Sequence, residues 1–256
     1  MNTVAPDFSV VVPVKNEAEN IGPLIAEICA VMASHQPFEI VYVDDGSDDG
    51  TLEILAGEAR DCPELRVLHH AATAGQSAAI ATGVASARGA VVITLDGDGQ
   101  NDPADIPLLL AKFKEAEDSD KVLVTGLRAR RRDAWLKRAS SRVANAVRGM
   151  LLGDGTPDTG CGLKVFSRQA FLDMPRFDHM HRFLPALMQR GGGQVVSVPV
   201  NHRPRERGTT KYGLFDRLGI GIVDLVGVMW LKRRALKPDI AASLEAGSKA
   251  DEGPKG

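Results

Sequence analysis

Short apolar runs alternate with amphipathic segments through the first 125 residues, and this alternation constrains the fold more than any other sequence feature. The runs are rich in Val and Ile, as parallel strands buried on both faces are. The intervening segments carry apolar residues at helical spacing. This predicts an α/β fold with a mostly parallel, doubly wound central sheet and flanking helices, in which ligands bind at the carboxyl ends of the strands. The predicted strands are 8–14, 39–43, 66–69, 90–95 and 121–125, and the helices are 21–32 (with Asn20 as N-cap), 51–60, 75–88 and 103–117.

The pattern is less regular beyond residue 125. Gly, Asp, Thr and Pro mark a loop over 153–162, and a polar, basic loop covers 201–213. Residues 238–256 have little apolar content and are predicted to form a disordered tail. Helices are expected at 133–152, 179–190 and 214–234, and strands at 163–166 and 194–200.

Composition excludes several classes of protein. The chain has 31 Lys+Arg and 33 Asp+Glu, and this near-balance argues against a chain-wide nucleic-acid surface. Its three cysteines fit neither a disulfide framework nor a CxxC metal site. No segment has the length and apolarity of a membrane span, and the start does not read as a signal peptide. We therefore expect a cytoplasmic protein.

Two predicted strands run into aspartates, at Asp44-Asp45 and at Asp96-Gly97-Asp98. Asp and Gly are also common turn formers, so either cluster alone is equally compatible with a solvated turn. Two clusters at one sheet edge repel each other unless a cation or a donor-rich ligand compensates them. Carboxylate oxygens suit Mg²⁺ or Mn²⁺. A calcium loop starting at Asp45 fails because its twelfth residue is Ala56, and neither GxGxxG nor GxxxxGK[ST] occurs.

Three motifs in order resemble a known family. Pro13-Val14-Lys15-Asn16-Glu17, the Asp44–Thr51 segment and Asp96-Gly97-Asp98 look like a family 2, inverting glycosyltransferase of the GT-A fold. Gly126-Leu127-Arg128, Ser141-Arg142-x-x-Asn145, the 158–164 segment and the 203–213 segment resemble the dolichol-phosphate mannose synthase and polyprenyl-phosphate glycosyltransferase branch. The resemblance covers residues 8–235. It implies one catalytic domain over 1–237, with a nucleotide-sugar half at 8–125 and an acceptor half at 126–237.

The resemblance also implies roles for individual residues. The metal, Mg²⁺ or Mn²⁺, would be bound by Asp96, Asp98 and Gln100, and catalysis would depend on Asp98, Arg128 and Arg142. The basic loop would close over the donor diphosphate, with Lys211 and either Arg205 or Arg203 as contacts. The nucleotide sugar would also contact Pro13, Lys15, Asn16, Glu17, Asp44, Asp45 and Asp96.

The charge distribution favours a lipid phosphate as acceptor. A sugar hydroxyl needs a general base, whereas a lipid phosphate is already anionic and needs positioning and charge compensation. Residues 128–148 contain eight basic residues and one acid, and Arg suits phosphate because its planar fork donates two hydrogen bonds. A solvated helix face is the alternative for any single member. Arg128 and Arg142 match family positions and are the preferred phosphate contacts.

The sequence leaves the donor and acceptor open. GDP-mannose is the first expectation for the donor, and a UDP-hexose such as UDP-glucose is the competitor. Transfer onto a saccharide hydroxyl is disfavoured because no QxxRW string occurs, and an inactive GT-A binding subunit is a further alternative. Helix 214–234 either packs on the core or lies on the membrane, with Lys232-Arg233-Arg234 near the lipid. The expected location is peripheral, at the inner face of the cell membrane, with or without a membrane-anchoring partner.

Overall fold

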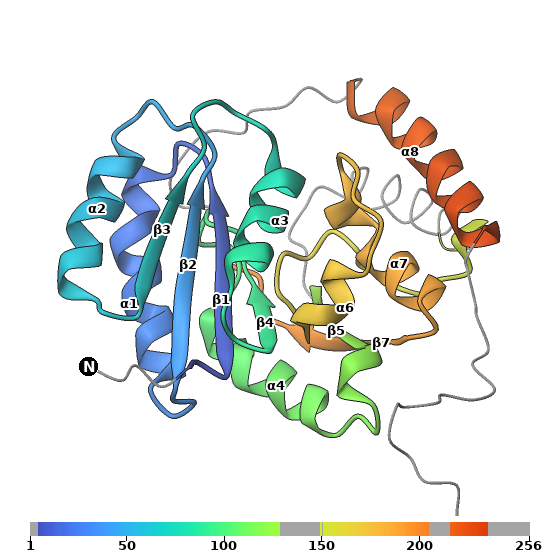
Figure 1. Cartoon of the computed structure of the whole chain (residues 1–256), viewed down its shortest axis with the longest axis horizontal. Coiled ribbons are helices and arrows are strands. Elements are labelled where there is room, and N and C mark those ends of the chain that lie inside the picture. Colours follow the sequence, from blue (N-terminus) through green and yellow to red (C-terminus); the bar gives the residue numbers. More distant parts are fainter. Residues whose placement is uncertain (1–4, 129–148, 150, 205–215, 235–256) are drawn as a thin grey trace, which may run out of the picture.

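The computed structural model describes residues 5–128, 149, 151–204 and 216–234 (Figure 1). Within them a seven-stranded sheet has the order β3-β2-β1-β4-β6-β5-β7. The strands are β1 (Phe8–Val14), β2 (Phe38–Asp44), β3 (Leu65–His69), β4 (Val91–Thr94), β5 (Val122–Arg128), β6 (Lys164–Ser167) and β7 (Gln194–Val200). The α-helices are α1 (Ile21–Met32), α2 (Thr51–Asp61), α3 (Gln76–Ser86), α4 (Ile106–Lys114), α6 (Arg168–Leu172), α7 (Leu184–Arg190) and α8 (Asp216–Arg233).

Strand β6 alone runs against its neighbours in this sheet. It pairs antiparallel with β4 on one side and with β5 on the other, while the remaining pairs are parallel. The first residue of β6 therefore lies at the edge where β1, β2, β4 and β5 end. The predicted α/β fold with a mostly parallel sheet is confirmed.

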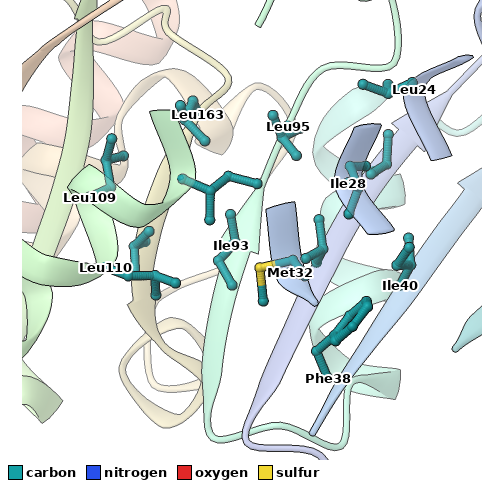
Figure 2. Close-up of a cluster of buried hydrophobic side chains, with 14 of the residues drawn as sticks. Leu24, Ile28, Met32, Phe38, Ile40, Ile93, Leu95, Leu109, Leu110 and Leu163 are labelled. Atoms are coloured by element: carbon teal, nitrogen blue, oxygen red, sulfur yellow. The ribbon is translucent and has the colours of Figure 1, made fainter. Parts of the chain in front are cut away.

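Alternate residues of each strand enter two separate hydrophobic cores. In β1, Val10 and Val12 belong to the core that includes α1 and α4, whereas Val11 belongs to the core that includes α3, α6 and α7. Figure 2 shows the first core, where Leu24, Ile28 and Met32 of α1 pack on strand residues such as Ile40 and Ile93. Burial on both faces explains why the strands read as continuous apolar runs.

The predicted strands match the observed ones closely, and β5 extends furthest beyond its prediction, to Arg128. Asn20 occupies the N-cap position of α1, as predicted, but its side chain makes no capping hydrogen bond. It belongs to a 3₁₀ turn, Ala18–Asn20, that runs directly into α1, and its side-chain amide donates to Glu17. The helices predicted at 103–117 and 179–190 each divide into a 3₁₀ turn followed by a shorter α-helix. Most of the predicted helix 133–152 and the predicted tail 238–256 lie outside the described residues.

Helix α8 has an inner face on the protein and an outer face in solvent (Figure 1). Val228 is buried in the second core, with Leu225 and Met229 packed against it. Arg190 of α7 donates to the Leu231 carbonyl at 2.9 Å. On the outer face, the exposed fractions are 58% for Ile222, 72% for Val223, 61% for Val226 and 60% for Trp230. No helix within the described residues is long and apolar enough to cross a membrane.

Candidate active site

Nearly all the described site residues predicted from the sequence gather at the carboxyl edge of the sheet. Lys15, Asn16 and Glu17 follow β1, Asp44 ends β2, and Asp45 follows it. Asp96, Asp98 and Gln100 follow β4, and Arg128 ends β5. Pro13 lies within β1, opposite Val43, next to the same edge. The remaining predicted site residues, Arg142, Arg205 and Lys211, lie outside the described residues.

Asp45 connects the end of β2 to the start of α3. Its buried carboxylate accepts hydrogen bonds from the backbone N–H groups of Ala74 and Gly75, at 2.9 and 2.8 Å, and pairs with His70 Nδ1 at 2.8 Å. Burial acts to raise the pKa of Asp45, but these hydrogen bonds and the His70 charge outweigh burial and lower it. The ionised form of Asp45 is therefore favoured, and its carboxylate faces the residues just before α3.

Asp44 faces a different set of groups from its neighbour. Its fully buried carboxylate accepts hydrogen bonds from the Ser47 backbone N–H at 3.2 Å and from the Ser47 hydroxyl, and it contacts His69 Nδ1 at 2.8 Å. Successive side chains of a strand point in opposite directions, which separates the two aspartates. Ser47 Oγ in turn accepts from the Asn16 backbone N–H at 2.8 Å, so Asp44 supports the loop after β1.

The loops after β1 and β2 are joined by a reciprocal pair. Asn16 has a positive φ of 52°, which asparagine tolerates, and its Nδ2 donates to Asp48 Oδ1 at 2.6 Å. The Asp48 backbone N–H donates back to Asn16 Oδ1 at 3.0 Å. Lys15 Nζ donates to Thr73 Oγ1 at 2.6 Å, which ties the same loop to the segment before α3. These loops form one connected edge.

Asp96 is enclosed by three segments. Its Oδ1 accepts from Gln76 Nε2 of α3 at 2.9 Å, and its backbone N–H donates to Asn101 Oδ1 at 3.0 Å. Gly162 lies against its carboxylate so closely that an added Cβ would be 2.3 Å from Asp96 Cγ. Burial, and next the charge of Asp98, raise the pKa of Asp96 to about 6, while the charges of Lys164 and Arg128 oppose the rise.

The donor set around Asp96 and Asp98 suits a hard divalent cation. Two carboxylates whose charges repel each other are brought together, and a cation would relieve this repulsion. Gln100 lies two residues beyond Asp98, and its side-chain amide is 3.4 Å from the Arg203 carbonyl oxygen. The described residues contain no group of three His, Cys, Asp or Glu side chains arranged to bind a metal. Such a cation would therefore complete its coordination with other oxygens, such as those of substrate phosphates.

Arg128 forms a bidentate ion pair with Asp158. Its Nε and Nη2 atoms each donate to one Asp158 oxygen at 2.7 Å, and both side chains are largely buried. Burial acts to lower the pKa of Arg128, but the Asp158 carboxylate outweighs burial and raises it. Among the described residues, the Arg128 guanidinium donates through Nε and Nη2 and makes no hydrogen bond through Nη1. Asp158 thus orients the guanidinium.

The start of the basic loop is fastened to the segment after β4. His202 forms a β-bridge with Asn101, and the Arg203 backbone N–H donates to the Gln100 carbonyl at 2.9 Å. The Arg203 guanidinium contacts Glu27 and Asp102, each at 2.7 Å. Arg203, the predicted alternative to Arg205, therefore already has two carboxylate partners. A cavity of about 300 Å³ lies beside it, lined by Asn20, Pro23, Leu24, Glu27, Asp98, Gly99, Arg203 and Pro204.

Sequence reasoning missed Gln76 and Asn101 as partners of Asp96. Gly75, which precedes Gln76, has a φ of 92°, and this turn brings the start of α3 to the site. A glycine between a strand and a helix was the available signal for Gln76. The signal for Asn101 was its position directly after the acidic motif.

A family model described as glycosyl transferase family 2 matches residues 9–174, from β1 through α6. The chain belongs to glycosyl transferase family 2. It is therefore an enzyme of the glycosyltransferase class, as the sequence predicted. The matched residues include the loops after β1, β2 and β4, together with Arg128 and Asp158.

Two relatives make the comparison more specific. The chain is 35% identical over 237 residues to the dodecaprenyl-phosphate galacturonate synthase of Rhizobium johnstonii, covering 91% of this chain and 69% of the relative. It is 36% identical over 221 residues to the undecaprenyl-phosphate 4-deoxy-4-formamido-L-arabinose transferase of Edwardsiella ictaluri, covering 85% and 66%. The chain thus spans about two thirds of the length of these relatives. Their names confirm the predicted resemblance to the polyprenyl-phosphate branch.

Solved structures support the GT-A fold. Glucosyl-3-phosphoglycerate synthase from Mycobacterium tuberculosis, in complex with Mg²⁺ and UDP, aligns with a TM-score of 0.66 at 17% identity, covering 93% of this chain and 83% of that one. Mannosyltransferase PcManGT from Pyrobaculum calidifontis, in complex with GDP-Man and Mn²⁺, aligns with a TM-score of 0.61 at 19% identity, covering 91% and 74%. At these identities the likeness concerns the fold alone.

Proposed function

We propose that this family 2 glycosyltransferase transfers a sugar from a nucleoside diphosphate sugar to a polyprenyl phosphate. The bond between the anomeric carbon and the donor diphosphate breaks, and a lipid phosphate oxygen forms the new bond on the opposite face of the sugar. The observation that carries this proposal is the meeting of Asp45, Asp96 and Asp98 with Arg128 at one edge of the sheet. The names of the relatives support the lipid phosphate as acceptor.

In this proposal the nucleotide-sugar half, residues 8–125, presents carboxylates to the donor. Asp96 and Asp98 would hold Mg²⁺ or Mn²⁺, with Gln100 as a third oxygen ligand, and the bound cation would supply positive charge to compensate the departing nucleoside diphosphate. Asp45 and the loop 15–17 face the nucleotide, and Asp44 acts through Ser47. Neighbours that bind Mg²⁺ or Mn²⁺ with nucleotides are consistent with this assignment.

The acceptor half, residues 126–237, supplies positive charge. Arg128 Nη1, which makes no hydrogen bond to any described residue, is proposed to donate to the lipid phosphate, with Arg142 as its partner. Arg205 and Lys211 are proposed to contact the donor diphosphate. The lipid phosphate is already ionised near neutral pH, so the site needs to orient it and compensate its charge, and needs no general base.

The names of the relatives bear on the identity of the donor sugar. GDP-mannose was the first expectation, but the names of the relatives give galacturonate and 4-deoxy-4-formamido-L-arabinose and lend mannose no support. We therefore favour a donor other than GDP-mannose. A UDP-sugar, the competitor that the sequence left open, is the first donor class to test.

The test is an assay with radiolabelled sugar donors, undecaprenyl phosphate and Mn²⁺. UDP-galacturonic acid, UDP-glucose and GDP-mannose are supplied separately, and lipid-linked product is separated by thin-layer chromatography. Asp98→Asn and Arg128→Met are expected to lower turnover at least 100-fold, and Glu115→Gln on the exposed end of α4 is the matched control. Absence of lipid-linked product with every donor would contradict the proposal. Product on a saccharide acceptor, or nucleotide binding without any turnover, would favour the alternatives that the sequence left open.

We also propose that α8 holds the enzyme on the membrane surface where its acceptor resides. Its outer face presents Ile222, Val223, Val226 and Trp230, and basic residues follow at Lys232, Arg233 and Arg234. An apolar face flanked by basic residues favours the interface of an anionic bilayer. Because the inner face of α8 packs on the second core, the helix serves both roles that the sequence left as alternatives.

Vesicle flotation tests this location. Wild type is expected to float with vesicles containing phosphatidylglycerol and to be released by high salt. The double variant Val226→Glu/Trp230→Glu is expected to stay in the lower fractions, whereas Leu108→Glu, at an exposed apolar position of α4, behaves as wild type. Equal flotation of wild type and the α8 variant would contradict the role of this helix.

A further inference from the structure

Lys164 is a buried cation at the catalytic edge with no role in the proposed site. It is the first residue of β6 and only 4% exposed. The sheet register places it opposite Thr94 of β4 and opposite Thr125 of β5. Because β6 is antiparallel to both neighbours, its beginning coincides with their carboxyl ends. Lys164 therefore lies in the middle of the sheet, and its partner in β4, Thr94, comes two residues before Asp96.

The turn before β6 connects Lys164 to Asp96. Lys164 Nζ donates to the Cys161 carbonyl oxygen, and the Gly162 carbonyl accepts from Thr94 Oγ1 at 2.7 Å. Gly162 itself is packed against the Asp96 carboxylate. Lys164 thus fixes the turn that covers one side of Asp96.

Burial of a charged lysine at this position lowers the stability of the fold. Transfer of an ammonium group from water into a protein interior costs several kcal/mol unless nearby charges compensate it. Within the described residues Lys164 has no carboxylate at ion-pair distance. Burial lowers its pKa, while the carboxylates of Asp96 and Asp158 act in the opposite direction. Since fold stability alone would favour an apolar residue here, the charge points to function.

We propose that Lys164 is an electrostatic positioning residue for the donor diphosphate and its metal. This inference rests on the proposed function. Asp96, Asp98 and a bound diphosphate together carry more negative charge than one divalent cation cancels, so a fixed positive charge behind Asp96 favours the loaded site. The same positive charge also stabilises the further negative charge that develops on the diphosphate as the sugar leaves.

Two variants separate the charge of Lys164 from its hydrogen bond. Lys164→Gln keeps a donor for the Cys161 carbonyl but removes the charge, and Lys164→Met removes both. Lys112→Gln, at an exposed lysine of α4, is the matched control. Binding of UDP and of GDP with saturating Mn²⁺ is measured by titration calorimetry, the melting temperature by calorimetry, and turnover with the donor that the assay above identifies.

Both Lys164 variants are expected to melt at or above the wild-type temperature and to bind the nucleoside diphosphate with Mn²⁺ at least 10-fold more weakly. Turnover should fall at least as much as binding. Wild-type binding in Lys164→Gln, or unfolding of both variants, would overturn this inference and show a structural role. If wild type binds no nucleoside diphosphate and transfers no sugar, the proposed function itself has failed.

Discussion

Gly162 and Asp96 are packed so closely that no side chain fits between them, because a Cβ on Gly162 would lie 2.3 Å from both Asp96 Cγ and Asp96 Oδ2. The two residues come from opposite halves of the chain. The turn before β6 therefore defines the position of a carboxylate that follows β4.

Replacing Gly162 with alanine is expected to displace the Asp96 carboxylate and to lower the affinity for Mn²⁺ with nucleotide at least 10-fold. Calorimetric titration measures the loss. Gly57→Ala in α2 is the control, because nothing lies within 4 Å of its added Cβ, and helix propensity predicts stabilisation by up to about 1 kcal/mol. Unchanged nucleotide binding in Gly162→Ala would show that Asp96 does not contribute to that site.

The Arg128–Asp158 pair should affect the acceptor and leave the donor unaffected. Asp158→Asn keeps the shape of the side chain but removes the charge that orients Arg128. We expect the KM for polyprenyl phosphate to rise about 10-fold while the KM for the donor changes less than 2-fold. Stability should fall by about 1–3 kcal/mol, because a largely buried guanidinium loses its charged partner. A rise in the donor KM alone would contradict the assignment of Arg128 to the acceptor.

Arg203 offers a test between two roles for the start of the basic loop. Its guanidinium is engaged by Glu27 and Asp102 and is partly exposed, so Arg203→Met should change stability by less than about 1 kcal/mol. If Arg203 fastens the loop through these carboxylates, Glu27→Gln/Asp102→Asn should reproduce the kinetic effect of Arg203→Met. Donor KM values for the three enzymes make the comparison. A rise in donor KM confined to Arg203→Met would instead indicate direct contact with the diphosphate.

Glu39 lies away from the candidate active site and is expected to make the stability of the fold depend on pH. Burial acts to raise its pKa, but hydrogen bonds from the Arg88 backbone, Arg66 and Ser9 outweigh burial and lower the pKa. A carboxyl with a lowered folded-state pKa contributes stability above its unfolded pKa, near 4.5, and loses it as pH falls through the folded value.

The measurement is urea unfolding of wild type and Glu39→Gln at pH 7 and at steps below pH 4.5. At pH 7 the variant should be less stable by about 2 kcal/mol, because the hydrogen bonds lose their charge. The difference should shrink as the pH falls. A difference that is constant across this range would show that the Glu39 charge is not responsible.

Local pattern was enough to predict the strands, because burial on both faces demands Val- and Ile-rich runs with polar residues at their ends. It also predicted that the candidate site residues after β1, β2 and β4 lie at one edge of the sheet. The N-cap position of Asn20 was predicted correctly, but local capping preferences do not reveal that the chain enters α1 through a 3₁₀ turn, in which the Asn20 side chain makes no capping hydrogen bond. Asp44 and Asp45 have different surroundings because successive side chains point in opposite directions at the end of a strand. This could have been predicted from the end of β2 at Asp44.

Contacts between segments far apart in the sequence could not be predicted from local sequence patterns. The place and direction of β6 depend on pairing with β4 and β5, and nothing in four residues of sequence specifies those partners. The contact of Gln76 with Asp96 and the bridge between Asn101 and His202 depend on the same long-range arrangement. Arg128 was proposed as a site residue from the sequence, but its ion pair with Asp158 was not predicted.

The reversed direction of β6 has a consequence for how such an enzyme can diversify. Strand β5 ends at Arg128 and β6 begins at Lys164, so both residues lie at the same edge of the sheet and are fixed there by strand pairing. The segment that joins two such strand ends can be exchanged between homologues without a change of strand register. Under the proposed function, grafting this segment from a relative with another acceptor is expected to change acceptor choice and to leave the loops after β1, β2 and β4 as they are.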